Sequence, residues 1–232
     1  MVQTASLLER ADLSRPIPEN TRKLAAFVQL TEGRLDIGPH SVFLREAHPP
    51  NAHYAKAVVL FLHGQSYSSS TWLEHDTLRN FAANGYRSIA IDLPGSGQTR
   101  GPALNQNEKP AFLLNLIEHL DLKQALVVCC SMSAQYVLPL LSSDRLLCVV
   151  AVAPSNTHEI PQPSSCRTPV LLLWGDRDTS LGPTSAANLK NLPFVRLHKI
   201  SNAGHAVYLH NPILFEQVAM NFFELIRNYH SF

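Results

Sequence analysis

Short runs of apolar residues recur along the chain and are separated by longer segments of mixed polarity. Five runs are apolar almost throughout, which is typical of strands buried on both faces of a sheet. They span residues 58–64, 87–95, 125–131, 146–154 and 169–176. Shorter patterns at 27–30 and 41–46, with a turn around Gly38, predict an N-terminal hairpin, and residues 195–200 predict a further strand.

Helical patterns lie between these runs. Apolar residues recur at helical spacing over residues 72–84, 108–120, 132–143, 183–192 and 211–228. Gly85 is a predicted helix stop, whereas Pro139 must kink or shorten the helix over 132–143. Strands that alternate with helices predict an α/β fold, with a mostly parallel central sheet, helices on both faces and an antiparallel hairpin at one edge.

The length and composition fit one globular domain. The chain has 232 residues, of which 45% are hydrophobic and 16% charged. Residues 1–22 are polar and are expected to form a flexible extension, which leaves residues 23–232 as a single domain. The net charge of +1 gives no reason to expect nucleic acid or an acidic membrane as a partner. The apolar runs are far shorter than the ~20 residues that span a bilayer.

The cysteines predict a reducing environment. Cys129, Cys130, Cys148 and Cys166 form no C-x-x-C motif and no cysteine–histidine cluster with zinc spacing. We therefore expect four reduced thiols and no metal. The N-terminus lacks the apolar core of a secretory signal. These features predict a cytoplasmic location, and the nucleus is considered as an additional one.

Polar groups that follow parallel strands meet at one edge of the sheet, which is where catalytic residues are expected. The run over 125–130 leads directly into Ser131 and then into a helical pattern. This is the position of a nucleophile elbow, a tight turn that needs small residues on both sides of the serine. Cys129 and Ser133 are small but are not glycine, so the G-x-S-x-G motif is absent. The alternative is an ordinary serine at a helix N-cap.

Two later segments supply an acid and a base. Asp178 follows the strand over 169–176 and is the candidate acid, while the nearby Asp176 is expected to cap the turn. His205 follows a small-residue turn just before the last helix and is the candidate base, with His210 as the local alternative. The chain order of serine, acid and histidine is the order that this type of triad follows.

These residue types fit acyl transfer. His205 would accept the hydroxyl proton of Ser131, and Asp178 would hold the imidazole in the required tautomer. The backbone N–H groups of Gln65 and Met132 are the candidate oxyanion-hole donors. His63, which precedes Gly64 and Gln65, is expected to be structural.

Several segments together resemble the α/β-hydrolase superfamily over about residues 40–230. They are HGQ at 63–65, AIDLPGSGQT, the serine elbow, LLLWGDRD and NAGHAVYLHNP. The serine-containing elbow, TWLEHDTL, and the Tyr136 to Pro139 segment resemble the α/β-hydrolase domain-containing protein 14 family, more specifically its soluble branch. On this resemblance Ser131 is the nucleophile, Asp178 the acid and His205 the base.

The resemblance implies activity on small acyl esters and deacetylation of lysine with acetyl transfer to coenzyme A. This chain departs from the expected family pattern at Cys129, Cys130 and Ala134, where serine, proline and glycine are expected. The methyl group of Ala134 would tighten the elbow but leave the Ser131 hydroxyl in place.

Three functions follow from these observations. The first is a serine hydrolase or deacylase for small acyl groups, with a small acyl substrate or an acetylated lysine as partner and no required cofactor. Only fourteen residues separate Pro154 from Pro169, which is too few for a large lid and predicts a minimal cap. The second is an acyltransferase with coenzyme A as acceptor, although the chain has no glycine-rich phosphate loop with a lysine. The third is a non-catalytic interaction module. Cys130 is a weaker alternative nucleophile.

Overall fold

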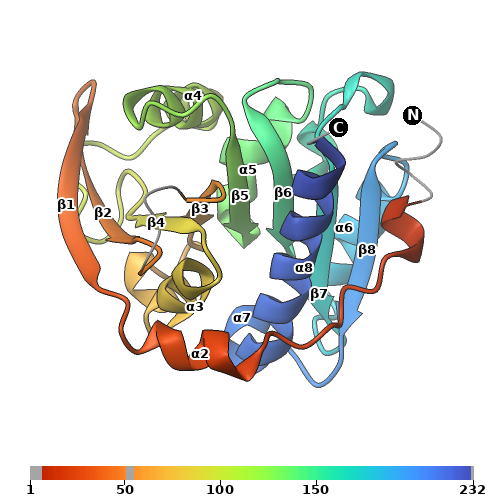
Figure 1. Cartoon of the computed structure of the whole chain (residues 1–232). Helices are drawn as coiled ribbons and strands as arrows, with labels where there is room; N and C mark the ends of the chain where they lie inside the picture. Colours follow the sequence, from red (N-terminus) through yellow and green to blue (C-terminus); the bar gives the residue numbers. More distant parts are fainter. Residues whose placement is uncertain (1–6, 51–54, 231–232) are drawn as a thin grey trace.

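The computed structural model describes residues 7–50 and 55–230 and contains one eight-stranded sheet (Figure 1). Its strand order is β1-β2-β4-β3-β5-β6-β7-β8. The strands are β1 (Leu30–Ile37), β2 (His40–Ala47), β3 (Val58–Leu62), β4 (Arg87–Ile91), β5 (Ala125–Cys130), β6 (Leu146–Val152), β7 (Val170–Gly175) and β8 (Val195–Ile200). Strand β2 pairs antiparallel with β1 and β4, and the other neighbours are parallel. This confirms the predicted mostly parallel sheet with an antiparallel edge.

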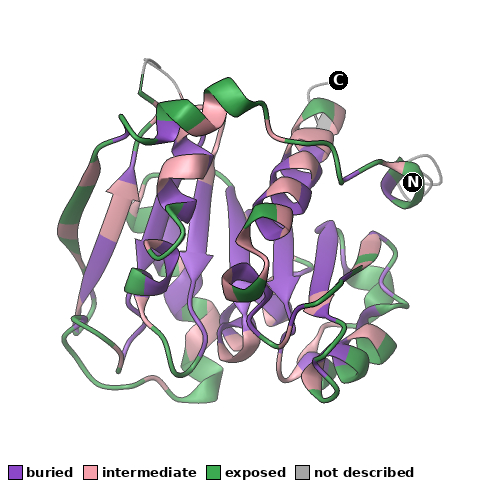
Figure 2. Ribbon diagram, turned by 90° about the horizontal axis from the view of Figure 1, so that it is seen from below, coloured by how far each residue is buried: buried purple, intermediate pink, exposed green. Residues whose placement is uncertain are grey.

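Helices cover both faces of the sheet, as predicted. One face packs against α3 (Thr77–Ala83) and α8 (Pro212–His230). The opposite face packs against α4 (Lys109–His119), α5 (Ala134–Val137) and α6 (Leu181–Leu189). Every residue of β5 is buried, because its side chains alternate between these two cores. Figure 2 shows the central strands as a buried layer between the helices.

The predicted helix over 132–143 is broken. The chain instead forms a 3₁₀ turn (η3, Ser131–Ser133), the short α5 and a second 3₁₀ turn (η4, Leu138–Leu140). Pro139 lies in the second turn, where it has no N–H to donate to an α-helical ladder. The prediction that Pro139 shortens this helix is confirmed.

Two further predicted elements differ from the pattern, whereas the predicted helix stop at Gly85 is confirmed. The segment 27–30 is not a strand, because β1 begins only at Leu30. The predicted helix over 72–84 is a 3₁₀ turn (η1, Ser69–Trp72), a turn and then α3, which starts after Asp76 with its positive φ of 55°. Gly85 ends α3 with φ of 95°, a conformation that glycine adopts without strain.

The described part of the expected extension packs onto the domain. Leu8 and Leu13 are buried in the core on the α8 side. The Asn221 amide on α8 donates hydrogen bonds to the Leu13 carbonyl at 2.9 Å and to the Arg15 carbonyl at 2.8 Å. Helix α2 (Glu19–Ala25) crosses the expected boundary at residue 22. The packed unit therefore starts before residue 23, because two leucines give this polar segment an apolar contact; residues 1–6 lie outside the described residues.

The connection from β6 to β7 is short and contains two 3₁₀ turns, η5 (Thr157–Glu159) and η6 (Pro163–Ser165). This agrees with the predicted minimal cap. A four-residue helix, α7 (Val207–His210), precedes α8 and was not predicted. No helix within residues 7–50 and 55–230 is both long and apolar enough to cross a membrane.

A buried carboxyl group joins α3 to α8 and makes stability depend on pH. Glu216 is 2% exposed, and the Asn80 amide donates to both of its oxygens at 3.0 Å. Burial raises the pKa of Glu216 to about 7. The folded protein therefore binds this proton up to a higher pH than the unfolded chain does. Stability from this group is present below the unfolded pKa and falls as the pH rises towards about 7.

We expect Glu216→Gln to become more stable relative to wild type as the pH rises from 5 to 8. The relative gain should be on the order of 3 kcal/mol, because the folded pKa lies well above the ordinary value of a glutamate. Urea unfolding of both proteins at pH 5 and pH 8 measures it, and other titrating groups cancel in the difference. If the difference in the free energy of unfolding between the variant and the wild type is the same at both pH values, a buried, protonated Glu216 is contradicted.

Candidate active site

Ser131 stands at a sharp turn between β5 and the helical segment that follows. Its φ is 51°, whereas Cys130 before it is extended and Ala134 after it is helical. A serine at positive φ is strained by roughly 1–2 kcal/mol, and such strain is typical of functional positions. The N-cap of the turn is Cys130 and not Ser131, so the alternative of an ordinary N-cap serine is wrong. The backbone has the strand–turn–helix form of a nucleophile elbow.

Two serine hydroxyls, that of the buried Ser133 and that of the partly buried Ser155, hold this turn without glycine. The Ser133 hydroxyl accepts the Cys130 N–H at 2.8 Å and lies 3.0 Å from the carbonyl oxygens of Leu62 and Cys130, to one of which it donates. The N–H and hydroxyl of Ser155 both donate to the Ser131 carbonyl, at 3.1 and 3.2 Å. Ala134 is fully buried at the crowded start of α5. The elbow is thus fixed from β3 and from the segment after β6.

His205 and Asp178 form a hydrogen-bonded pair. The Nδ1 atom of His205 lies 2.7 Å from Oδ2 of Asp178. The Asp178 side chain is buried, whereas the His205 side chain is 44% exposed. Burial alone would raise the pKa of Asp178, but hydrogen bonds from His205 and from the N–H groups of Ser180 and Gly182 lower it overall. An ionised Asp178 can accept the Nδ1–H of His205, and in the neutral imidazole with this tautomer Nε2 is the acceptor.

The two local alternatives make other contacts. The exposed Asp176 accepts the Ala203 N–H at 3.3 Å, in keeping with the turn-capping role that we expected for it. His210 accepts the Gly204 N–H on its Nδ1 atom at 3.1 Å. Asp178 is therefore the aspartate that the structure brings to His205, and His210 supports the turn that precedes it.

A buried histidine, His63, fixes the loop after β3 that carries Gln65. His63 accepts the Leu93 N–H on Nε2 at 3.0 Å and bonds the Gly64 carbonyl through Nδ1 at 2.8 Å. Burial lowers the pKa of His63, so the ring is neutral. In a trans peptide the N–H points opposite the carbonyl, so fixing the Gly64 carbonyl also fixes the direction of the Gln65 N–H. This agrees with the structural role expected for His63.

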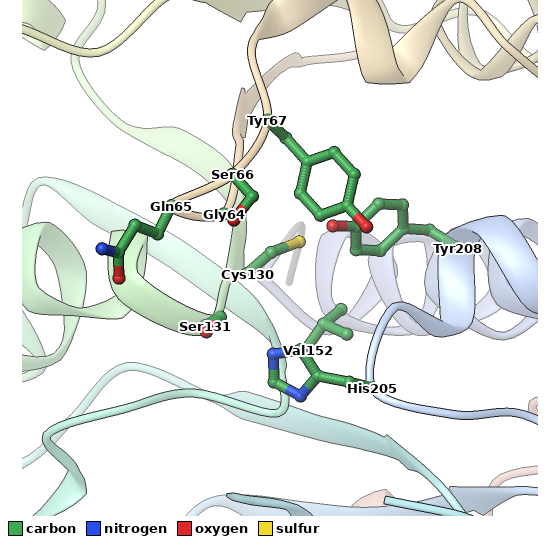
Figure 3. Close-up of a pocket in the computed structure, with 9 residues that line it drawn as sticks. All are labelled: Gly64, Gln65, Ser66, Tyr67, Cys130, Ser131, Val152, His205 and Tyr208. Carbon is green, nitrogen blue, oxygen red and sulfur yellow. The ribbon is translucent and has the colours of Figure 1, made fainter. Parts of the chain in front are cut away.

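Ser131 and His205 line the same pocket, which has a volume of about 190 Å³ (Figure 3). Its lining residues are Gly64, Gln65, Ser66, Tyr67, Cys130, Ser131, Val152, His205 and Tyr208. In Figure 3 the His205 ring lies beside Ser131, with one ring nitrogen on the side of the serine. Because Nδ1 binds Asp178, that nitrogen is Nε2. A nitrogen in that position could take the serine proton, and the role of His205 as general base stays a prediction.

Only part of this lining was predicted from the sequence. Gln65 was expected there, whereas Tyr67 and Tyr208 were missed although each lies close to a predicted site residue. The side chain of Met132 packs towards the α4 side, and an oxyanion role for its N–H stays a prediction. Within the described residues no cluster of three or more histidine, cysteine or acidic side chains could hold a metal ion.

The cysteines near the site are free and buried. The Cys130 thiol reaches the pocket wall, yet burial raises its pKa well above the ordinary value. Because the thiolate is the reactive form, a buried and protonated Cys130 is a poor nucleophile. The geometry therefore favours Ser131.

A parallel sheet between helices, with a strained serine after a central strand and an Asp–His pair at the same edge, defines an α/β hydrolase. A model described as the alpha/beta hydrolase family matches residues 59–167. The chain is 37% identical to human ABHD14B over 197 residues, covering 82% of this chain and 93% of that protein. It is 35% identical to human ABHD14A, covering 81% of this chain and 71% of that protein. The chain belongs to the ABHD14 family of α/β hydrolases.

Solved structures share the fold at lower identity. A CIB-like hydrolase from Thermoplasma acidophilum superposes with a TM-score of 0.74 at 23% identity, over 87% of this chain and 99% of that chain. A naproxen esterase from Bacillus subtilis superposes with a TM-score of 0.71 at 15% identity, over 90% of this chain and all of that chain. Both similarities support the α/β-hydrolase architecture.

Proposed function

We propose that this protein is a serine hydrolase that removes small acyl groups, with Ser131 as nucleophile, His205 as base and Asp178 as the orienting acid. One observation carries the proposal: a serine at positive φ lines the same pocket as an imidazole whose far nitrogen is held by a buried carboxylate. Strain at the serine and a fixed tautomer at the histidine both serve nucleophilic attack.

The proposed reaction has two halves. The Ser131 oxygen attacks the acyl carbonyl carbon while Nε2 of His205 accepts the hydroxyl proton. The resulting oxyanion accepts hydrogen bonds from the N–H groups of Gln65 and Met132. His205 then returns the proton to the departing alcohol or amine, and an ester on Ser131 is left. Water attacks this ester with His205 as base again, so that a carboxylic acid and free Ser131 are formed.

The relatives suggest acyl-lysine as the substrate class. The name of ABHD14B from human and from rat describes it, provisionally, as a protein-lysine deacylase. In this chain the half-exposed His205 lets an amine leaving group on a protein surface reach the proton that it needs. The connection after β6 adds only two 3₁₀ turns near the site, so a folded substrate protein could approach.

A fluorophosphonate probe tests the nucleophile directly. We expect the probe to modify Ser131 and no other serine, because the probe requires a serine that a base activates. Peptide mapping by mass spectrometry identifies the residue, and His205→Ala should abolish the modification. Labelling at another serine, or labelling that survives His205→Ala, would contradict the proposal. A protein that stays unlabelled while folded would support a non-catalytic module instead.

Water is the proposed acceptor, and coenzyme A is the alternative. We expect an acetyl-lysine peptide to release free acetate at the same rate with or without coenzyme A, since the triad needs only water to complete the cycle. Chromatography of the products separates acetate from acetyl-coenzyme A. If acetyl-coenzyme A forms when coenzyme A is present, and no acetate is released when coenzyme A is left out, then coenzyme A is the acceptor and water is not.

A further inference from the structure

Two tyrosines meet at the end of the pocket away from Ser131. The rings of Tyr67 and Tyr208 lie 6.2 Å apart at 76°, and Figure 3 shows their hydroxyl groups turned towards each other. Tyr208 is buried, and its ring packs 4.8 Å from that of Trp72 in the core. Tyr67 is 37% exposed and stands on the loop after β3. Tyr208 is therefore held in place by the core, whereas Tyr67 is carried by a loop.

The acyl group is the part of the substrate that fits this pocket. The leaving group must receive a proton from His205, whose side chain is exposed to solvent. The lysine side of the scissile bond remains attached to another protein, so it lies at the solvent side of the site, where His205 is exposed. The acyl chain attached to Ser131 can enter the pocket, between the loop of Gly64 and the side chains of Cys130 and Val152.

We propose that Tyr67 and Tyr208 close the acyl end of this pocket and thereby restrict the enzyme to short, uncharged acyl groups. The proposal rests on the proposed function. A cavity of about 150 Å³ holds benzene, a molecule of about six carbon atoms. The pocket must also take the carbonyl group beside Ser131, so acyl chains of about two to five carbons fit it.

The charge of the lining excludes acidic acyl groups. Among the nine described residues that line the pocket, His205 is the one that could carry a positive charge, and Asp178 already binds it. The closed end consists of two phenols and the Cys130 thiol. Burial raises the pKa of both Cys130 and Tyr208, so this end is neutral. A succinyl or malonyl carboxylate would be buried there without a partner.

Chain-length profiles of two opposite Tyr67 variants test the proposal. With p-nitrophenyl esters, kcat/KM of the wild type should rise by about fourfold per methylene from acetyl to butyryl. It should then fall at least about tenfold at octanoyl, because the chain exceeds the pocket. Tyr67→Ala should raise the octanoyl-to-butyryl ratio at least about tenfold, and Tyr67→Trp should lower the butyryl-to-acetyl ratio by about tenfold.

Phe27→Ala is the matched control, because Phe27 is an aromatic residue that is 77% exposed outside the pocket. Its profile should follow the wild type. A succinyl-lysine peptide should react at least about 100-fold more slowly than a butyryl-lysine peptide. Unchanged profiles in both Tyr67 variants, with Ser131 still labelled, would overturn this inference and leave the proposed function standing. A wild type without labelling at Ser131 would overturn both.

Discussion

Ser131→Ala is expected to lower kcat for p-nitrophenyl acetate by about 10⁴- to 10⁶-fold, the range found when the nucleophile of a serine hydrolase is removed. The oxygen that forms the acyl-enzyme is lost, and neither the Cys130 thiol nor another pocket group can replace it, because burial keeps that thiol protonated. The pocket and the loop of Gln65 should stay intact, so KM should change little. Steady-state kinetics measures both constants.

Ser70→Ala is the matched control for Ser131→Ala. Ser70 is exposed on the loop after β3, and its hydroxyl bonds only that of Ser68, at 2.8 Å, and no further group of the described chain. Its kcat should stay close to that of the wild type, and thermal unfolding of both variants checks that they fold. A Ser131→Ala protein that keeps more than a tenth of the wild-type kcat would exclude Ser131 as the nucleophile.

Asp178→Asn is expected to lower kcat by about 10³- to 10⁴-fold. The carboxylate accepts the Nδ1–H of His205 at 2.7 Å, whereas an amide can offer its NH₂ group and favour the tautomer with the proton on Nε2. That tautomer cannot accept the proton of Ser131. Because the pKa of Asp178 is lowered, the carboxylate is ionised at neutral pH, and its loss should slow the reaction throughout that range.

The neighbouring Asp176→Asn provides the control for Asp178→Asn. The asparagine oxygen can still accept the Ala203 N–H, so the turn after β7 should persist. We expect kcat to change by less than about threefold, as for an exposed polar substitution. Equal losses of kcat in the two variants would mean that catalysis depends on the turn after β7 and not on the contact between Asp178 and His205.

The sheet could be predicted because its central strands are buried on both faces. Segments such as 125–130 are therefore continuously apolar, and no polar alternation obscures them. The sequence positions of Ser131, Asp178 and His205 could also be predicted, since each follows a strand whose end must lie at the same edge of a parallel sheet. The structure brings His205 and Asp178 into contact, and the catalytic roles of all three residues stay predictions.

Other features depend on contacts between distant residues, which leave no pattern of apolar positions in the sequence. Leu8 and Leu13 are two of the few large apolar residues in a mostly polar segment, and their burial depends on the core beside α8. Tyr67 and Tyr208 lie 141 positions apart in the chain, so their meeting at the pocket has no local signal. The glycine-free elbow also depends on a contact between distant segments, because the buried hydroxyl of Ser133 bonds the backbone of both β3 and β5.

The most direct measurement is a rapid quench of the wild-type enzyme with p-nitrophenyl acetate, followed by mass spectrometry of its peptides. If Ser131 is the nucleophile, we expect a mass increase of one acetyl group on Ser131 that is absent from Ser131→Ala and from His205→Ala. Turnover of the ester with the acetyl group on another side chain, or with no enzyme-bound acetyl group at any quench time, would contradict this role of Ser131.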